Sequence, residues 1–482
     1  MAIPAGQREA AAFLEKLTGG GVTETHVSAV FLGPDEALKL KKAVDLGFLD
    51  FTRLEERERL VRFEHELNAP QAPSLYLGCE KLTRGPEGLR LGGEGEAVDW
   101  VLRMRRLPAD AFLSERPCEP ELLDPMADAV AALHAGAPRR EGDGDMTRVL
   151  TGNREAGLAA GLPREAVLRW SRTALALHGR LRAWLYGRAS RGFLRRCHGD
   201  LHLGNVCLID GRPTPFDALE FDEALATIDT GYDLAFLLMD LTIRHGRGPA
   251  NRVLNRYLAR TGDVALLRGL PLWLSLRAFI RAHVAARSGD DPAGLLAAAL
   301  EWLEPPPRPV LVAIGGLPGS GKSTVGRLVA AALGPSPGAV HLRSDEIRKR
   351  RHGISPEERL PQTAYGPAEA RQVFAELREL AGAALNAGCS VVADGAYLDP
   401  REREAIASAA PDFFGFWLEA PLDTLRARVA SRSGDASDAD VAVLDMMAAR
   451  EAGPLDWTRL DSTSDPATVA RKMLDSLPSA PP

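Results

Sequence analysis

Apolar and polar positions divide the chain into stretches of different periodicity. Residues 22–107 alternate in short, strand-like pieces around one charged stretch, Leu54–Leu67, that is typical of a helix. After about residue 120 the pattern becomes helical, and it is interrupted at 193–222 by a stretch typical of loop and short strands. Within that interruption Asp210-Gly211 separates two short runs, which predicts a hairpin turn. We therefore expect a small β-rich lobe followed by a larger helical lobe.

Consecutive prolines mark the clearest boundary in the sequence. Three prolines in a row cannot continue a helix and favour a stiff, extended connector. Residues 292–303 before them have the Ala- and Leu-rich pattern of a helix, and Val310–Ile314 after them is an apolar strand candidate. We predict a first domain at 1–303 (small lobe about 20–107, helical lobe about 108–303), a linker at 304–309, a second domain at 310–475 and a frayed tail at 476–482.

Composition is that of an ordinary folded protein. At 482 residues, the chain is long enough for two or three domains, and 45% hydrophobic with 26% charged residues excludes global disorder. A net charge of −6 argues against a broad surface for nucleic acid or membrane. The five cysteines form no CxxC pair, which favours a reducing compartment. The N-terminus lacks a signal-peptide pattern and no apolar run is long enough to span a membrane, so we expect a cytoplasmic protein.

A glycine-rich segment follows the apolar strand at 310–314. Gly316, Gly321, Lys322 and Ser323 fit the phosphate-binding loop (P-loop) pattern between a strand and a helix. Glycines let backbone N–H groups approach phosphate, Lys322 reaches the β- and γ-phosphates of ATP, and the Ser323 hydroxyl helps to hold Mg²⁺. The residues expected to bind the nucleotide are Gly316, Leu317, Pro318, Gly319, Ser320, Gly321, Lys322, Ser323 and Thr324.

Two further apolar strands of this domain each end in an acid, Asp345 and Asp394, and Arg348 follows Asp345 by one helical turn. With the P-loop, they resemble the small P-loop kinases: gluconate kinase, chloramphenicol phosphotransferase, zeta toxins and polynucleotide kinases, over about residues 309–475. The resemblance implies that Asp345 contacts the acceptor hydroxyl as a base, that Arg348 orients the substrate, and that Asp394 holds the Mg²⁺ water shell. The alternatives are a helix N-cap for Asp345 and a turn residue for Asp394.

Two arginines follow the strand expected at Phe413–Leu418. Arg428 and Arg432 have i, i+4 spacing, which predicts that they lie on one helix face. In the same resemblance they are the lid arginines that neutralise the phosphoryl group in transfer, and Ser437–Asp440 is a mobile turn beside them. A solvated basic face is the alternative.

Polar residues cluster in the loop-and-strand stretch of the first domain. His198, Asp200 and Asn205 have the spacing of the protein-kinase catalytic loop, and Asp217 ends a short strand twelve residues after Asn205. Phosphoryl transfer needs positioned charge more than covalent chemistry. We therefore expect Asp200 to orient and deprotonate an incoming hydroxyl, and Asn205 and Asp217 to hold Mg²⁺ against the phosphates.

The loop reads HGD where protein kinases have HRD, and Tyr232–Phe236 follows it. These elements, in this order, resemble the aminoglycoside phosphotransferase and choline kinase superfamily over about residues 20–300. The resemblance implies that the strand at Ala37–Lys42 carries the lysine that contacts ATP. Lys39 and Lys41 face the same side of that strand and either can serve; Lys39 is favoured.

The partner of this lysine is expected on the charged helix that follows. Glu66 is favoured and Glu64 is second, with an ordinary solvated helix face as the alternative. The strand at Val101–Leu107 is expected to enter the hinge that contacts adenine through its backbone.

The histidines near the loop lack zinc-ligand spacing. His198 and Asp233 are expected to brace the catalytic loop, whereas His202 is left open between a buried hydrogen-bonding residue and a substrate contact. A cationic acceptor would need an acidic pocket. Four acids near the site are candidates for it: Glu220, Asp222, Glu223 and Asp229. The alternative is a solvated loop. Glu220 and Asp222 are also candidate metal or substrate ligands.

The whole chain resembles bacterial proteins that fuse an aminoglycoside phosphotransferase-like kinase to a small P-loop kinase. The expected fold is an α+β bilobal protein-kinase-like domain followed by an α/β domain whose parallel sheet is covered by helices on both faces. The expected activity is ATP- and Mg²⁺-dependent phosphorylation of hydroxyl groups of small molecules (sugars, amino sugars or aminocyclitols) at two kinase sites. The alternatives are that one domain is an ATP-binding regulatory switch, or that the C-terminal domain acts on nucleic-acid 5′-hydroxyls, for which the basic run 343–351 is the signal.

Overall fold

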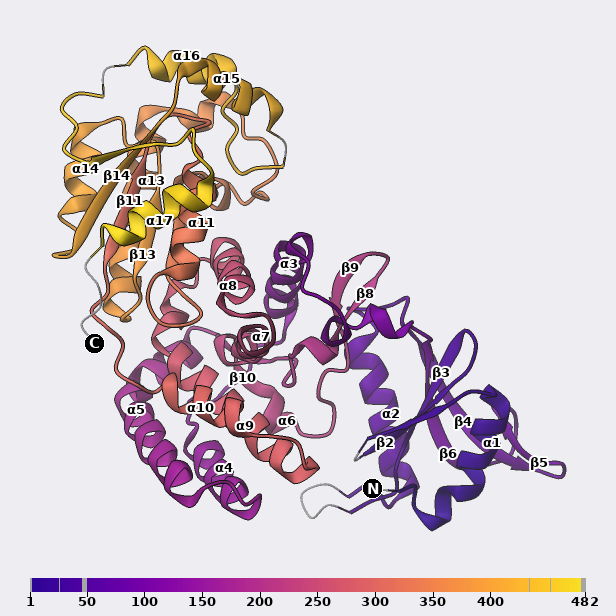
Figure 1. The fold of residues 1–482 in the computed structure, drawn as a ribbon. Helices are drawn as coiled ribbons and strands as arrows, with labels where there is room; N and C mark the ends of the chain where they lie inside the picture. The colour runs from indigo at the N-terminus through magenta and orange to yellow at the C-terminus, as the bar shows by residue number, and fades with distance from the viewer. Residues whose placement is uncertain (1, 26, 46–49, 433, 451, 478–482) are drawn as a thin grey trace. The chain divides into compact units, whose positions relative to one another are not determined.

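The computed structural model describes residues 2–25, 27–45, 50–432, 434–450 and 452–477. Contacts divide the chain into two compact units (Figure 1). The first unit consists of Met1–Gly144 and Trp184–Leu234, and the second consists of Asp145–Ala183 and Ala235–Pro482. The second unit therefore includes helices that precede the proline segment, whereas the domain boundary at 304–309 stays a prediction. Most of the predicted tail, 478–482, lies outside the described residues.

An antiparallel sheet of six strands forms the small lobe of the first unit, in the order β1-β2-β3-β6-β4-β5. Its strands are β1 (Val22–Glu24), β2 (Ser28–Leu32), β3 (Glu36–Lys41), β4 (Tyr76–Gly85), β5 (Gly88–Leu91) and β6 (Glu96–Arg105). Apolar side chains of the central strands, such as Phe31, Leu40 and Val101, pack with α1 (Arg8–Thr18) in one core cluster. Helix α2 (Leu54–Asn68), which the sequence predicts almost to the residue, contacts β4 and β6.

Short strands and helices follow the small lobe. The helices are α3 (Pro120–Gly136), α4 (Thr147–Ala159), α5 (Arg164–Ser190), α6 (Glu223–Ala226), α7 (Thr230–His245), α8 (Arg247–Thr261), α9 (Leu270–Ser288) and α10 (Ala293–Glu301). The strands form two antiparallel pairs: β7 (Leu194–Arg196) with β10 (Thr227–Asp229), and β8 (Val206–Ile209) with β9 (Arg212–Pro215). Asp210 and Gly211 both have positive φ at the β8–β9 turn, which confirms the predicted hairpin.

A parallel sheet of five strands, in the order β12-β13-β11-β14-β15, lies in the C-terminal part of the second unit (Figure 1). Its strands are β11 (Leu311–Gly315), β12 (Val340–Arg343), β13 (Val391–Asp394), β14 (Phe413–Glu419) and β15 (Thr458–Asp461). The flanking helices are α11 (Lys322–Ala332), α12 (Ser344–Arg351), α13 (Pro367–Asn386), α14 (Pro400–Ala407), α15 (Leu422–Ser431), α16 (Val441–Ala448) and α17 (Pro466–Asp475). The fold class is thus the predicted one.

Strand order places the functional loops at one edge of this sheet. The central strand β11 pairs in parallel with β13, and β13 pairs with β12. Because the carboxyl ends of parallel strands meet at the same edge, the P-loop after β11, Asp394 at the end of β13 and Asp345 after β12 come together. The core beneath them consists of buried aliphatic residues such as Val312, Val329 and Val392.

Helix α8 also contacts this sheet within the second unit. Asn251 Nδ2 donates to the Ala339 carbonyl (2.9 Å), and Asn255 Oδ1 accepts from the His341 backbone N–H (2.7 Å). The P-loop sheet is therefore hydrogen-bonded along its β12 edge by residues that precede the proline segment.

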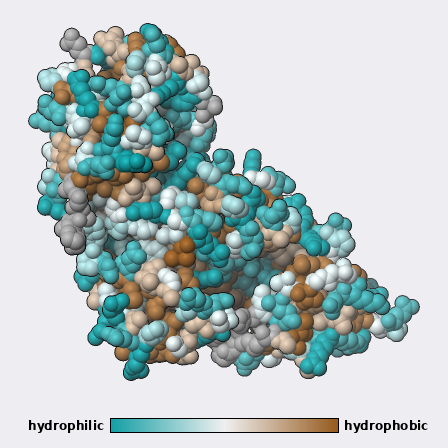
Figure 2. All heavy atoms as spheres, in the orientation of Figure 1, coloured by the Kyte–Doolittle hydropathy of each residue, from teal (hydrophilic) through white to brown (hydrophobic). Residues whose placement is uncertain are grey.

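Polar side chains dominate the face seen in Figure 2, with apolar residues scattered between them. Within the described part of the chain, no helix combines the length and the apolar character that crossing a bilayer requires.

Candidate phosphoryl-transfer sites

The first site lies where β3 and α2 meet the loop after β9. Lys39 Nζ donates to Glu64 Oε1 (2.7 Å) and to Asp217 Oδ1 (2.6 Å). Lys41, which shares its face of β3, donates to Glu64 Oε2 (2.6 Å) and forms a short ion pair with Glu220. One buried carboxylate, 1% exposed, therefore fixes both lysines. Of the two, Lys39 reaches Asp217 and is the more exposed, which supports its predicted contact with the nucleotide.

The prediction of Glu66 as the partner of the lysine is wrong. Glu66 is exposed, because it lies about 200° around helix α2 from the buried Glu64. Leu60, Val61 and Asn68 are buried with Glu64, so the spacing of these residues is the signal that identifies the inward face.

The catalytic-loop motif is held by buried hydrogen bonds. Asp233 accepts the backbone N–H groups of His198 and Gly199 (3.0 Å each) and lies 3.1 Å from His134 Nε2. His198 Nε2 contacts the Phe216 carbonyl (2.9 Å), and burial lowers the pKa of its imidazole. This arrangement confirms the expected bracing role of His198 and Asp233.

Asp200 lies at the surface of the loop, and its side chain is 43% exposed. Asn205 Nδ2 donates to its carboxylate (3.0 Å), and His202 Nε2 lies 3.5 Å from the same Oδ2. His202 also accepts the Gly204 N–H (3.0 Å) through Nδ1. His202 is thus a mostly buried hydrogen-bonding residue that also faces the candidate base.

The first site offers oxygen ligands that suit Mg²⁺. Asn205 uses its amide nitrogen toward Asp200, and within the described residues no donor reaches Asn205 Oδ1 or Asp217 Oδ2. Asp217 has a left-handed backbone (φ 61°), and its N–H donates to the Tyr76 hydroxyl (2.9 Å). Amide and carboxylate oxygens are the ligands that Mg²⁺ prefers, so the residues present fit this ion.

The four acids that are candidates for an acidic acceptor pocket each have a partner within the first unit. Glu220 pairs with Lys41, Asp222 caps α6 through the N–H groups of residues 224 and 225, and Glu223 pairs with Arg140 and Arg196. Asp229 pairs with the fully buried Arg188 (2.6 Å). These carboxylates already have cationic or N–H partners, which favours the alternative, a loop whose acids serve the structure.

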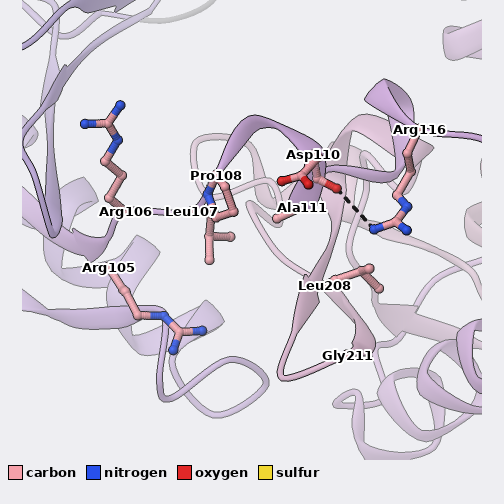
Figure 3. A pocket seen from close by; sticks show the side chains of 9 residues that line it. All are labelled: Arg105, Arg106, Leu107, Pro108, Asp110, Ala111, Arg116, Leu208 and Gly211. Atoms are coloured by element: carbon pink, nitrogen blue, oxygen red, sulfur yellow. Dashed lines mark hydrogen bonds between the residues drawn. The ribbon is translucent and has the colours of Figure 1, made fainter.

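A pocket of about 430 Å³ borders the predicted hinge (Figure 3). It is formed by residues 105–108, 110, 111 and 116 with Leu208 and Gly211 of the β8–β9 hairpin. Arg116 donates to the Asp110 carbonyl (3.2 Å) along one side. The pocket is thus lined on one side by the chain after β6 and on the other by the β8–β9 hairpin.

The second site is built around the P-loop. A Cβ at Gly316 (φ 142°) would lie 2.6 Å from the Leu418 carbonyl oxygen, and one at Gly319 (φ 82°) 2.7 Å from that of Leu425, so both positions require glycine. Lys322 Nζ donates to the Leu317 carbonyl (3.0 Å) across the loop. Burial lowers the pKa of Lys322, although Asp394 and Asp345 oppose this effect.

Two acids stand beside this lysine, and their pKa values are shifted in opposite directions. Ser323 Oγ donates to Asp394 Oδ2 (2.6 Å), the hydroxyl–carboxylate pair that a P-loop uses for Mg²⁺. Burial alone would raise the pKa of Asp394, but His341, Lys322 and Arg343 lower it to about 2. Burial raises the pKa of Asp345, and the nearby Asp394 adds to the effect. A carboxyl with a raised pKa suits a base that must take a proton from a hydroxyl.

Asp345 is not the N-cap of α12. The cap position is Arg343, and Asp345 is the second helical residue. Arg348, one turn later, is largely buried, donates to the Ala364 carbonyl (3.0 Å) and stacks over Tyr365. Tyr365 in turn donates to Asp438 (2.5 Å), which also pairs with Lys349 (2.8 Å).

The predicted shared helix face of Arg428 and Arg432 is wrong. Helix α15 ends at Ser431 and Arg432 has an extended backbone, so the two side chains diverge. Arg428 donates to the carbonyls of Gly319 in the P-loop (3.4 Å) and Ser462 (2.9 Å). Arg432 donates to the Ala439 carbonyl (2.7 Å) and lies 3.6 Å from Asp435. The turn expected to be mobile at Ser437–Asp440 is anchored through Asp438.

Sequence reasoning also missed residues around Asp394. His341 Nε2 lies 3.6 Å and Arg343 Nε 3.8 Å from Asp394 Oδ2. The basic run 343–351 was the sequence signal for a nucleic-acid substrate. Four of its residues form ion pairs with acids of the same unit: Arg343 with Glu346, Lys349 with Asp438, Arg350 with Glu376, and Arg351 with Glu369 and Glu376. Its charge is therefore largely neutralised.

Comparison with known proteins places the chain in a family. A protein of Mycobacterium tuberculosis is 31% identical over 472 residues, which cover 90% of this chain and 90% of the relative. The chain belongs to the same family. The relative is described as an uncharacterized protein. Residues 311–454, which include the P-loop of this chain, match the family model of an AAA domain.

Solved kinases resemble separate parts of the chain. A gluconokinase from Sinorhizobium meliloti is 22% identical, with a TM-score of 0.26, and covers 35% of this chain and 91% of its own length. A choline kinase from Cryptosporidium parvum is 12% identical, with a TM-score of 0.38, and covers 61% of this chain and 93% of its own length.

Proposed function

We propose that the protein is an ATP- and Mg²⁺-dependent phosphotransferase with two kinase sites, each acting on a hydroxyl group of a small molecule. The observation that carries the proposal is that each unit, by itself, brings a lysine together with carboxylate, amide or hydroxyl oxygens of the kind that can hold Mg²⁺. Lys39 contacts Asp217 in the first unit (2.6 Å), and Ser323 contacts Asp394 beside Lys322 in the second (2.6 Å). Neither set depends on the other for its hydrogen bonds.

In the first site, Asp200 is the base that orients the acceptor hydroxyl and receives its proton. Lys39 neutralises phosphate charge, and Glu64 holds Lys39 in place. Asn205 and Asp217 would hold Mg²⁺, which when bound shields the charge on the transferring phosphoryl group. The pocket beside the hinge supports a place for the nucleoside end of ATP, because it borders the segment after β6.

In the second site, Asp345 takes the hydroxyl proton, and its raised pKa suits that role. Backbone N–H groups of residues 316–324 and Lys322 bind the phosphates. Ser323 and Asp394 would hold Mg²⁺, and Arg428 reaches the P-loop through Gly319. Sugars, amino sugars and aminocyclitols are the proposed acceptor classes, without an acidic pocket built from residues 220–229.

Phosphorus NMR of the full chain with ATP, Mg²⁺ and pooled acceptors tests the proposal. The pools hold hexoses, sugar acids, amino sugars, aminoglycosides, nucleosides and short oligonucleotides. Asp200→Asn and Asp345→Asn are compared with Asp210→Asn and Asp423→Asn, whose side chains are 79% and 95% exposed.

A phosphomonoester lost in only one of the two site variants assigns that reaction to one unit, and two products lost separately establish two kinase sites. If ATP binds and no phosphomonoester forms with any acceptor, the kinase proposal fails and an ATP-dependent switch replaces it.

A further inference from the structure

We propose that Arg343 and Arg432 form a subsite for an anionic group of the acceptor, a carboxylate or a phosphate, and that the Asp435 carboxylate occupies it in this structure. The inference deepens the proposed function and rests on it, since it names the class of acceptor at the second site.

The contacts of Asp435 are those of a bound anion. Its Oδ1 accepts from Arg343 NH2 (2.6 Å), and its Oδ2 lies 3.6 Å from Arg432 NH1. Each oxygen of one carboxylate therefore faces a different guanidinium group. Guanidinium groups are frequent partners of carboxylate and phosphate oxygens. The Arg343 contact is a hydrogen bond, the Arg432 contact is a longer ion pair, and the Ala436 N–H also donates to Oδ1 (2.7 Å). Burial would raise the pKa of Asp435, but Arg343 and Arg432 lower it, so the group is an anion at neutral pH.

The subsite lies within reach of the reacting groups. Arg343 is the last residue of β12, two positions before Asp345, and its Nε lies 3.8 Å from Asp394. Arg343 and Arg432 both act on Lys322, whose pKa they help to lower. An acceptor whose anionic group replaces Asp435 would thus place its body beside the base and the phosphate-binding lysine.

Arg343 also has donor capacity that its present partners leave unused. Its side chain is 10% exposed, and the buried Nε–H has no hydrogen-bond partner within the described residues. Buried N–H groups without an acceptor are uncommon and point to a missing partner. An acceptor oxygen between Arg343 and Asp394, or a water that such an acceptor orders, would satisfy this group.

A purely structural ion pair is the competing interpretation, and the response to phosphate separates the two. Arg343 already has Glu346 as an anionic partner at 2.9 Å, so it does not need Asp435 for neutrality. Lys322 adds positive charge nearby. Exchange of Asp435 for the anion of a ligand leaves the buried charge unchanged, whereas a neutral ligand would leave Arg432 without an anion.

Chemical restoration of the missing anion tests the subsite. The full chain and its Asp435→Ala variant are unfolded thermally with saturating Mg·ADP, which fills the P-loop, in sodium phosphate or in sodium chloride of equal ionic strength. We expect Asp435→Ala to have a lower Tm in chloride and to regain a few degrees in phosphate. Asp423→Ala, exposed on α15, should respond to phosphate as the unchanged protein does.

The Arg343→Ala, Asp435→Ala double variant should lose the phosphate response. If that double variant does not fold, Asp435→Asn, which preserves side-chain shape, is compared with Asp435→Ala in the same series. An equal phosphate response in Asp435→Ala, Asp423→Ala and the unchanged protein would overturn the subsite.

Acceptor turnover separates this inference from the proposed function. D-Gluconate and D-glucitol, which share a carbon chain and differ in a carboxylate, are compared with 3-phosphoglycerate and glycerol as acceptors for the Asp345-dependent reaction. Preference for the charged member of a pair supports the subsite, and faster turnover of the neutral member overturns it. A phosphate response without turnover of any pooled acceptor keeps the subsite and removes the kinase proposal.

Discussion

Lys39 and Asp217 form an ion pair of 2.6 Å that joins strand β3 to the loop after the β8–β9 hairpin. The two residues are 178 positions apart in the sequence. Burial would lower the pKa of Lys39, but Asp217, Glu64 and Glu220 raise it well above its usual value, so the lysine is fully charged at neutral pH. Charge at this place is what a phosphate contact requires.

Two glutamates on helix α2 give a matched pair of variants. Glu64→Gln removes the charge that holds Lys39 and Lys41, and breaking a buried ion pair costs about 3–5 kcal/mol of the free energy of unfolding. Glu66→Gln changes an exposed residue and should shift the free energy of unfolding by less than about 0.5 kcal/mol. Urea unfolding of both variants measures the difference, and equal effects would contradict the assigned contacts.

Lys39→Met should lower turnover at the first site by roughly 10²–10³-fold, the size of effect seen when one charge-stabilising donor is removed. The measurement is acceptor-dependent ADP release in an Asp345→Asn background, so that the second site is silent. Lys16→Met, on the exposed face of α1, should leave the rate unchanged. Full activity of Lys39→Met would transfer the role to Lys41.

The two acids of the second site should have opposite effects on stability. The pKa of Asp394 is lowered to about 2, so its ionised form stabilises the fold above pH 4 and the contribution is lost as the pH falls from about 4 to 2. Asp394→Asn should therefore lower the free energy of unfolding at pH 7 by roughly 2 kcal/mol.

Asp345 has a raised pKa, so its folded form favours the proton, and ionisation destabilises the fold as the pH rises through that pKa. Asp345→Asn should raise the free energy of unfolding at pH 7 while abolishing turnover at this site. Guanidinium unfolding between pH 3 and 7 measures both variants. Destabilisation by both at pH 7 would contradict the assigned environments.

The asparagines of α8 should stabilise the sheet that carries the second site, although they do not contact the site. Asn255→Ala removes the acceptor of the His341 N–H, and an unsatisfied buried donor costs about 1–3 kcal/mol. We expect a lower Tm with nucleotide affinity retained below the transition, as measured by calorimetry. Asp423→Ala, whose side chain is 95% exposed, is the comparison, and an equal or larger loss of Tm in that variant would contradict the role of Asn255.

How much of each site the sequence predicts depends on the distance along the chain. Asp200, Asn205 and Asp217 lie within one short hairpin region, so their spacing determines their geometry. The P-loop is equally local, because its glycines and Lys322 stand between one strand and one helix.

Residues that meet across the fold could not be placed in this way. The choice between Glu64 and Glu66 depends on the rotation of α2 against the sheet, which only the buried pattern of Leu60 and Val61 indicates. Asp435 reaches Arg343 from 92 positions away, and no local period connects them. Arg432 was misplaced because α15 ends one residue earlier, and a helix end is the least reliable feature of a periodic pattern.

The hydrogen bonds from α8 to β12 bear on how such a chain is exchanged between genomes. Strand β12, which leads to Asp345, is hydrogen-bonded along its edge by Asn251 and Asn255, and both residues lie before the prolines. A recombination that cut the gene at 304–309 would carry the P-loop away from these partners. We therefore expect the shortest fragment that keeps the P-loop sheet stable to begin before α8 and not at the proline boundary.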